Sequence, residues 1–140
     1  MNVDDAGNGL VEVTLGWVSL ERSGRESLVP AGASCRTRPK VGPGTPFFDD
    51  ATEPFKRALT ELDSGRGGSV PLETVLAAAR ARDTLTLWHL LSRVDARDRL
   101  RVYTRMVALA PLPNGVSEAK VLQLDAETLK HWREELAWKW

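Results

Sequence analysis

The residue types that most often perform chemistry in proteins are scarce in this sequence. It contains one cysteine, Cys35, and two histidines, His89 and His131. A cysteine nucleophile needs a neighbouring base, and a zinc site needs several Cys or His ligands at short spacing. No motif supplies a base for Cys35, and neither histidine has a second histidine four residues away on the same helical face. We therefore expect no enzymatic activity, no metal, no cofactor and no small-molecule substrate.

Two groups of basic residues could instead bind an acidic partner or a nucleic acid. Arg97, Arg101 and Arg105 are spaced by four residues and would form a stripe along one helix. The second, smaller group consists of Arg36, Arg38 and Lys40. Because acidic residues are interspersed and the formal net charge is zero, we interpret both groups as solvated faces. A nucleic-acid-binding regulator that uses the arginine stripe is the alternative.

The tryptophans give the clearest indication of a binding surface. Trp17 fits one face of a strand, whereas Trp138 and Trp140 lie at the C-terminal end, where so short a chain has little to cover them. An exposed tryptophan contributes a large apolar area at low cost in rotamer entropy, so it often anchors a protein interface. We predict Trp17, Trp138 and Trp140 as partner-binding residues; the alternative is that the C-terminal pair folds back over the helices.

Sustained helical periodicity organises the second half of the chain. Residues 83–110 predict two helices packed against each other, with Trp88 between them and His89 buried. Asp83 and Asp95 precede the two runs, where a side-chain oxygen can cap a helix. Further helices are expected at 52–62, capped by Asp49 or Asp50, from Pro71 onward, at 117–122, and after Asp125 as a cap.

The period changes to two in the first part of the chain. Val11, Val13, Leu15 and Trp17 would share one face of a strand, with a bulge at Gly16. Ser23-Gly24 separates this run from the next and is typical of a tight hairpin turn.

These patterns predict an α+β fold, in which a small antiparallel β unit is followed by an irregular helical bundle. We expect a disordered leader at 1–9, the β unit at 10–38, a Pro/Gly-rich linker at 39–48 and the helical domain at 49–140. Three prolines and two glycines within the linker disfavour both sheet and helix there.

Composition and hydropathy indicate a soluble globular chain. Apolar residues make up 42% and charged residues 27% of the sequence, which is the range of folded soluble proteins. No apolar run approaches the roughly 20 residues that span a bilayer, and the start lacks the features of a secretory signal. Taken as it stands, the chain is expected in the cytoplasm.

The β segment resembles the last part of the FecR domain, which occurs in regulators of extracytoplasmic-function sigma factors. The similar stretches are 11–20 (VEVTLGWVSL), 23–25 (SGR) and 28–32 (LVPAG), in which Gly16, Val18, Gly24, Leu28, Ala31 and Gly32 fit the pattern. The segments 30–35, 42–50 and 85–91 are similar to a version of these proteins with a helical C-terminal extension.

The resemblance implies signal relay through contact with a protein partner, without catalysis. Regulators of this type carry an N-terminal sigma-binding region, a transmembrane helix and further strands, so this chain would correspond to the C-terminal, periplasmic portion of a membrane-anchored regulator. Anti-sigma activity itself is not implied, because the segment that would hold it is not in this sequence.

Overall fold

The computed structural model describes residues 2–3, 9–22, 24–38, 42–65 and 69–140. It contains antiparallel strands in the first part of the chain and helices in the rest, which confirms the predicted α+β class. The chain divides into two compact units, Met1–Val75 and Leu76–Trp140. The division falls inside helix α2 (Ser69–Ala78) rather than in the linker predicted at 39–48.

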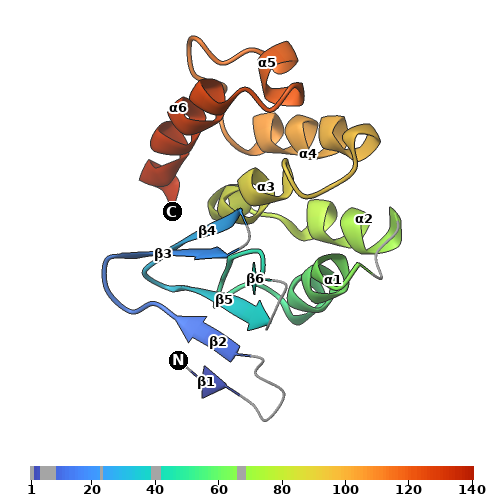
Figure 1. The fold of residues 1–140 in the computed structure, drawn as a ribbon. Helices are drawn as coiled ribbons and strands as arrows, with labels where there is room; N and C mark the ends of the chain where they lie inside the picture. The colour runs from blue at the N-terminus through green and yellow to red at the C-terminus, as the bar shows by residue number, and fades with distance from the viewer. Residues whose placement is uncertain (1, 4–8, 23, 39–41, 66–68) are drawn as a thin grey trace. The chain divides into compact units, whose positions relative to one another are not determined.

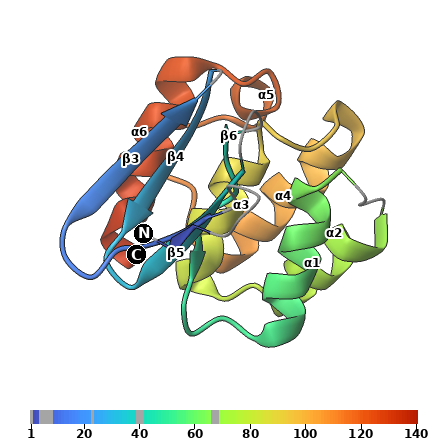
Figure 2. The same cartoon turned by 60° about the horizontal axis from the view of Figure 1, so that its bottom comes forward.

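The first unit contains all of the described strands and helix α1 (Figure 1). One antiparallel sheet has the order β1-β2-β5-β6, and β7 also pairs with β5. Its strands are β1 (Asn2–Val3), β2 (Gly9–Glu12), β5 (Ala33–Arg38), β6 (Gly42–Pro43) and β7 (Phe47–Phe48). The strands β3 (Trp17–Arg22) and β4 (Arg25–Pro30) form a separate two-stranded antiparallel sheet (Figure 2).

The predicted hairpin between β3 and β4 is confirmed. Arg22 lies opposite Arg25 in the register, and Gly24 has a φ of 78°, a conformation that glycine adopts readily. Ser23 itself lies outside the described residues. The expected bulge at Gly16 is instead a turn: β2 ends at Glu12, Gly16 has a φ of 70°, and β3 begins at Trp17 in a different sheet.

Two of the predicted non-structured segments contribute strands. In the leader predicted at 1–9, Asn2 and Val3 pair with Leu10 and Gly9, so disorder is wrong for these positions; residues 1 and 4–8 lie outside the described part.

In the linker predicted at 39–48, β6 and β7 both pair with β5, and Phe47 and Phe48 are buried. Strands as short as these accommodate proline at their ends, where a missing N–H breaks few ladder bonds. Residues 39–41 of the predicted linker are not among the described residues.

Helix α1 (Glu53–Asp63) begins close to the predicted position but has a different cap. The hydroxyl of Thr52 accepts a hydrogen bond from the backbone N–H of Phe55 at 3.4 Å, so the cap is Thr52 and not Asp49 or Asp50. The buried side of α1 carries Phe55, Ala58 and Leu59, which supply apolar contact area to the core of the first unit.

The last residue of α1, Asp63, connects three segments of the first unit. Its carboxylate accepts hydrogen bonds from the backbone N–H and the hydroxyl of Thr45, at 2.9 and 2.7 Å, and pairs with Arg25 of β4 at 3.3 Å. An acidic side chain at a helix C-terminus is repelled by the helix dipole, so these donors offset an unfavourable position. Asp63 and the backbone of Arg36 lie close to Gly44: a Cβ on Gly44 would be 3.0 Å from Asp63 Oδ2 and 3.1 Å from the carbonyl oxygen of Arg36.

The second unit is helical and matches most of the predicted elements. It contains α3 (Thr84–Leu90), α4 (Ala96–Leu109), α5 (Glu118–Leu122) and α6 (Ala126–Leu136), with 3-10 turns at Ala81–Asp83 and Ala137–Lys139. The predicted cap of the last helix is present, since the side chain of Asp125 accepts from Thr128 N; Ser117, predicted as the first residue of its helix, is instead the N-cap of α5, and its side chain accepts from Lys120 N.

The predicted caps of the central helix pair are not present. The carboxylate of Asp83 accepts from the backbone N–H of Arg80 and pairs with the Arg80 guanidinium, both at 2.8 Å, so it closes the preceding turn instead of capping α3. Asp95 occupies the N-cap position of α4, but its side chain makes no capping hydrogen bond.

The core of the second unit is built around Trp132 rather than Trp88. Trp132 is 0% exposed, and its ring meets that of Tyr103 edge to face at 5.8 Å between centroids. Trp88 is only half-buried, and its Nε1–H donates to the carbonyl oxygen of Leu129 at 3.0 Å.

Replacing Asp63 tests its role as the connection within the first unit. We expect Asp63→Ala to lower the free energy of unfolding by about 2 kcal/mol, because Thr45 and Arg25 lose a charged acceptor. The matched control is Glu61→Ala, an exposed acid on the same helix, which should change it by less than about 0.5 kcal/mol. Urea denaturation of both variants measures the difference, and equal effects would contradict this role.

Candidate functional site

Two large apolar side chains of the first unit lie exposed on either side of Gly16. Trp17, at the start of β3, is 51% exposed, and Leu15, in the preceding turn, is 88% exposed. The sequence pattern identified Trp17 as a partner-binding residue but placed Leu15 on a strand face. The turn at Gly16 places both residues at the surface, so they form an apolar pair that the sequence analysis missed.

The exposed pair adjoins an open strand edge. Within the part of the chain that the structure describes, β3 pairs along one side only, with β4 (Figure 2). Ser19 and Glu21, on the same face as Trp17, are also exposed. A strand with one unpaired side can receive a further strand through main-chain hydrogen bonds. The first unit therefore offers an edge with an aromatic anchor at one end.

The other two predicted anchor residues lie in the second unit and differ from each other. Trp138 is 88% exposed, whereas Trp140 is half-buried and donates from Nε1 to the hydroxyl of Thr84 at 2.9 Å. Trp140 thus follows the alternative in which the C-terminal end folds back, here onto the first residue of α3. Trp138 is left as the exposed tryptophan of this unit.

The predicted arginine stripe is divided among structural contacts. Arg105 donates from Nε to the carbonyl oxygen of Leu76 at 2.9 Å and from Nη2 to that of Ala79 at 3.2 Å. These carbonyls belong to the C-terminal end of α2 and the residue that follows it, where backbone acceptors lack helical partners. Arg101 and Arg97 lie 3.5 Å from the carboxylates of Asp98 and Asp95. The stripe is therefore not a continuous free basic surface.

His89 is buried, as predicted, and makes a structural hydrogen bond. Its Nδ1–H donates to the carbonyl oxygen of Leu85 at 2.7 Å. Burial is the main cause that lowers the pKa of His89 to about 3, and the nearby charges of Arg93 and Arg133 lower it further, while the bond to Leu85 opposes them. The imidazole is therefore neutral at pH 7.

Cys35 is fully buried in β5, with its Sγ 3.2 Å from the carbonyl oxygen of Gly44. The described residues contain no group of three or more His, Cys, Asp or Glu side chains that could hold a metal ion. The chemistry-bearing residue types thus contribute to packing where the structure places them.

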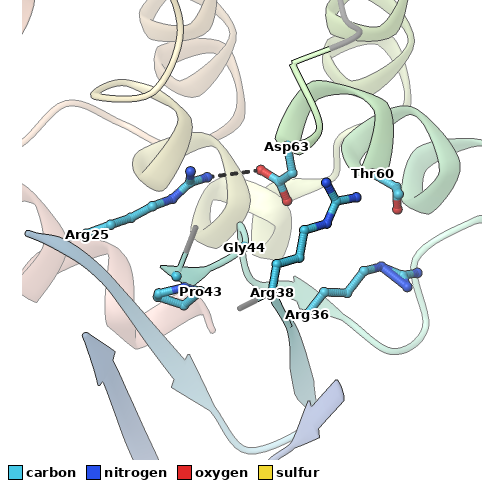
Figure 3. A pocket seen from close by; sticks show the side chains of 8 residues that line it. Arg25, Arg36, Arg38, Pro43, Gly44, Thr60 and Asp63 are labelled. Carbon is cyan, nitrogen blue, oxygen red and sulfur yellow. Dashed lines mark hydrogen bonds and ion pairs between the residues drawn. The ribbon is translucent and has the colours of Figure 1, made fainter. Parts of the chain in front are cut away.

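A small cavity in the first unit brings basic residues together (Figure 3). Its volume is about 20 Å³, and its lining comprises Arg25, Arg36, Arg38, Gly42, Pro43, Gly44, Thr60 and Asp63. The sequence analysis singled out Arg36 and Arg38, while Lys40 of that cluster lies outside the described residues. It missed Arg25 and Asp63, because they come from β4 and α1 and only the tertiary fold brings them beside β5.

The charges around this cavity are unequal. Arg25 pairs with Asp63, the one acid among the described residues of the lining. The guanidinium of Arg36 lies 5.4 Å from the centre of the Phe47 ring, a cation–π arrangement. Among the residues whose positions are described, neither Arg36 nor Arg38 has an ion-pair partner, and Arg25 Nε is buried without a hydrogen-bond acceptor.

Comparison with known proteins adds no relative. No protein-family model, no curated protein and no solved structure matches this chain. A search of the described residues for a helix with the length and apolar character needed to cross a membrane finds none.

Substitution of Arg105 separates a structural from a nucleic-acid-binding role. We expect Arg105→Met, which keeps much of the aliphatic stem, to lower the free energy of unfolding by about 1–2 kcal/mol, because two carbonyls lose a charged donor. Arg97→Met is the control, since this side chain is 84% exposed and should change stability by less than about 0.5 kcal/mol. Thermal and urea denaturation measure both, and a neutral Arg105→Met would contradict the structural role.

The buried imidazole predicts a loss of stability in acid. The unfolded chain protonates His89 near pH 6.5, whereas the folded chain resists protonation until about pH 3. The contribution of His89 to the free energy of unfolding is therefore fully present above pH 6.5. As the pH falls from 6.5 toward 3, only the unfolded chain takes up the proton, and the free energy of unfolding falls by about 1.4 kcal/mol per pH unit.

Urea denaturation of wild type, His89→Gln and His131→Gln between pH 7 and 5 measures this slope. His131 is exposed, so its variant should keep the pH dependence of the wild type, while His89→Gln should flatten it. An unchanged dependence in His89→Gln would show that the imidazole is not the group responsible.

Proposed function

We propose that this chain is a non-catalytic protein-interaction module of the FecR type, which passes on a signal through contact with a protein partner. The observation that carries the proposal is the exposure of Leu15 and Trp17 beside the side of β3 that pairs with no strand among the described residues. The partner binds by adding an extended segment to this edge, with an apolar residue placed against Trp17.

Different groups of such an edge contribute to the affinity and to the selectivity for a partner. Main-chain N–H and C=O groups of β3 give hydrogen bonds that any extended segment can make, so they contribute affinity. The indole of Trp17 and the side chain of Leu15 favour a partner with an apolar residue at the matching position, because burying them removes apolar area from water. Exposed Ser19 and Glu21 lie farther along the same face and add polar contacts.

The resemblance to FecR-type regulators supports the proposal through its glycines. Gly16, Gly24 and Gly32 have φ values of 70°, 78° and 86°, so each stands at a turn where other residues are strained. The turn at Gly24 agrees with the pattern of the resemblance, whereas Gly16, which the resemblance places within a strand, stands at a turn between β2 and β3. As part of the proposal, we assign the module to the periplasmic portion of a membrane-anchored regulator.

The nucleic-acid-binding alternative has less support. Of its three arginines, Arg105 donates to backbone carbonyls, and Arg97 and Arg101 each lie beside an acidic side chain. Few positive charges then remain to displace counterions from a phosphate backbone, which is the main source of affinity in such complexes. We therefore do not propose a nucleic-acid partner.

Site-specific photo-crosslinking tests the proposed surface. A benzophenone side chain placed at position 17, in the chain expressed in its own organism, should capture one protein in an adduct of defined mass. The same group at position 61, on the exposed face of α1, is the control and should not capture that protein. Absence of an adduct at 17, or identical adducts from both positions, would contradict the proposal.

A pair of substitutions distinguishes binding from folding. We expect Leu15→Ser and Trp17→Ala to weaken binding of the captured protein at least about tenfold, the effect of removing an interface anchor worth about 1.4 kcal/mol or more. Because Leu15 is 88% exposed and Trp17 51% exposed, the thermal midpoint should change little for Leu15→Ser and only moderately for Trp17→Ala. A variant that unfolds more easily yet binds as the wild type does would assign these residues to stability instead.

A further inference from the structure

We propose that the cavity lined by Arg25, Arg36 and Arg38, called here the arginine cavity, binds an oxyanion group, either a carboxylate or a phosphate. This site is separate from the edge proposed for protein docking. The proposal rests on the charge of the cavity, on its size and on its unsatisfied hydrogen-bond donors.

The first argument is charge. Among the residues that the structure describes, three guanidinium groups and one carboxylate, that of Asp63, line the arginine cavity. Asp63 is already engaged, because it accepts from Thr45 twice and pairs with Arg25. Of the other two guanidinium groups, that of Arg36 is exposed and lies over the Phe47 ring, whereas Arg38 is half-buried, so part of the hydration of Arg38 is lost. An anion that enters restores electrical balance where solvent screening is reduced.

The second argument is hydrogen bonding. Arg25 Nε is a buried donor without an acceptor among the described residues, and a buried native donor that stays unsatisfied is destabilising. Guanidinium groups present parallel N–H donors that match the two oxygens of a carboxylate or a phosphate. In Figure 3 the guanidinium of Arg38 points toward Asp63 and Thr60, while Arg25 approaches Asp63 from the opposite side.

The third argument is size, which limits what can enter. A volume of about 20 Å³ is room for about one water molecule or one oxygen atom. A ligand would therefore insert a single oxygen, with the rest of the group held at the opening by Arg36 and Arg38. Gly44 forms part of the wall, and its lack of a side chain lets Asp63 Oδ2 and the carbonyl oxygen of Arg36 approach closely there.

The arginine cavity and the docking edge lie at opposite ends of one hairpin. Arg25 stands opposite Arg22 at the turn, whereas Trp17 stands opposite Pro30 at the far end. Five steps along a strand separate the two ends by about 17 Å. Failure of one proposal therefore leaves the other standing.

Titration with simple anions, followed by NMR, tests the site. Sodium phosphate and sodium acetate are added to the full chain, each compared with sodium chloride at equal ionic strength. We expect a saturable shift of the backbone amides of Gly44 and Thr45 and of the Arg25 Nε–H signal with phosphate, acetate or both, and none with chloride. Saturation by phosphate alone identifies a phosphate ligand, and saturation by acetate alone identifies a carboxylate.

Three variants assign the effect to the cavity. Arg38→Gln should weaken the binding at least tenfold, and Arg38→Lys should weaken it less, because it keeps the charge but loses the paired donors. Arg57→Gln makes the same change of charge at an exposed position of α1 outside the cavity lining, and should bind as the wild type does. Equal shifts with chloride, or an unchanged titration in folded Arg38→Gln, would overturn the proposal.

Discussion

The first unit depends on one carboxylate, that of Asp63. It stands at the C-terminal end of α1, where the helix already presents partial negative charge, so its position is favourable only with donors around it. Thr45 and Arg25 are those donors, and they come from the segment between β6 and β7 and from β4. The same ion pair that holds α1 against the hairpin also forms one wall of the arginine cavity. Asp63 therefore contributes both to the stability of the first unit and to the lining of the proposed anion site.

This arrangement gives the β3–β4 hairpin two ends with different surroundings. At the turn, Arg25 is tied to Asp63, and the backbone of Gly42 lies close to Arg22, since a Cβ on that glycine would stand 3.1 Å from the Arg22 carbonyl oxygen. At the other end, Trp17 and Leu15 are exposed. Val29 and Pro30 are buried at this end and the N–H of Ala31 donates to the carbonyl oxygen of Gly16, so the exposed side chains stand on backbone that is already ordered, and little needs to be ordered when a partner binds.

In the second unit, the residue types that suggest chemistry satisfy backbone groups instead. Arg105 donates to carbonyls at the end of α2, His89 donates to Leu85 one helical turn away, and Trp88 donates to Leu129 of another helix. Short helices leave many carbonyls without helical partners relative to their length. In a bundle of such helices, long polar side chains that reach across can satisfy these carbonyls, as those of Arg105 and Trp88 do.

The sequence by itself determined what depends on neighbours in the chain. Alternation and periodicity located the strands and helices, Gly24 marked the hairpin, and Ser117 and Asp125 marked two helix starts, because such preferences act over a few residues. Only the tertiary structure placed the strands in the Pro/Gly-rich segment, exposed Leu15, covered Trp140 and joined Arg25 to Asp63 across 38 positions. Those outcomes depend on which distant surfaces pack together, and packing leaves no periodic trace in the sequence.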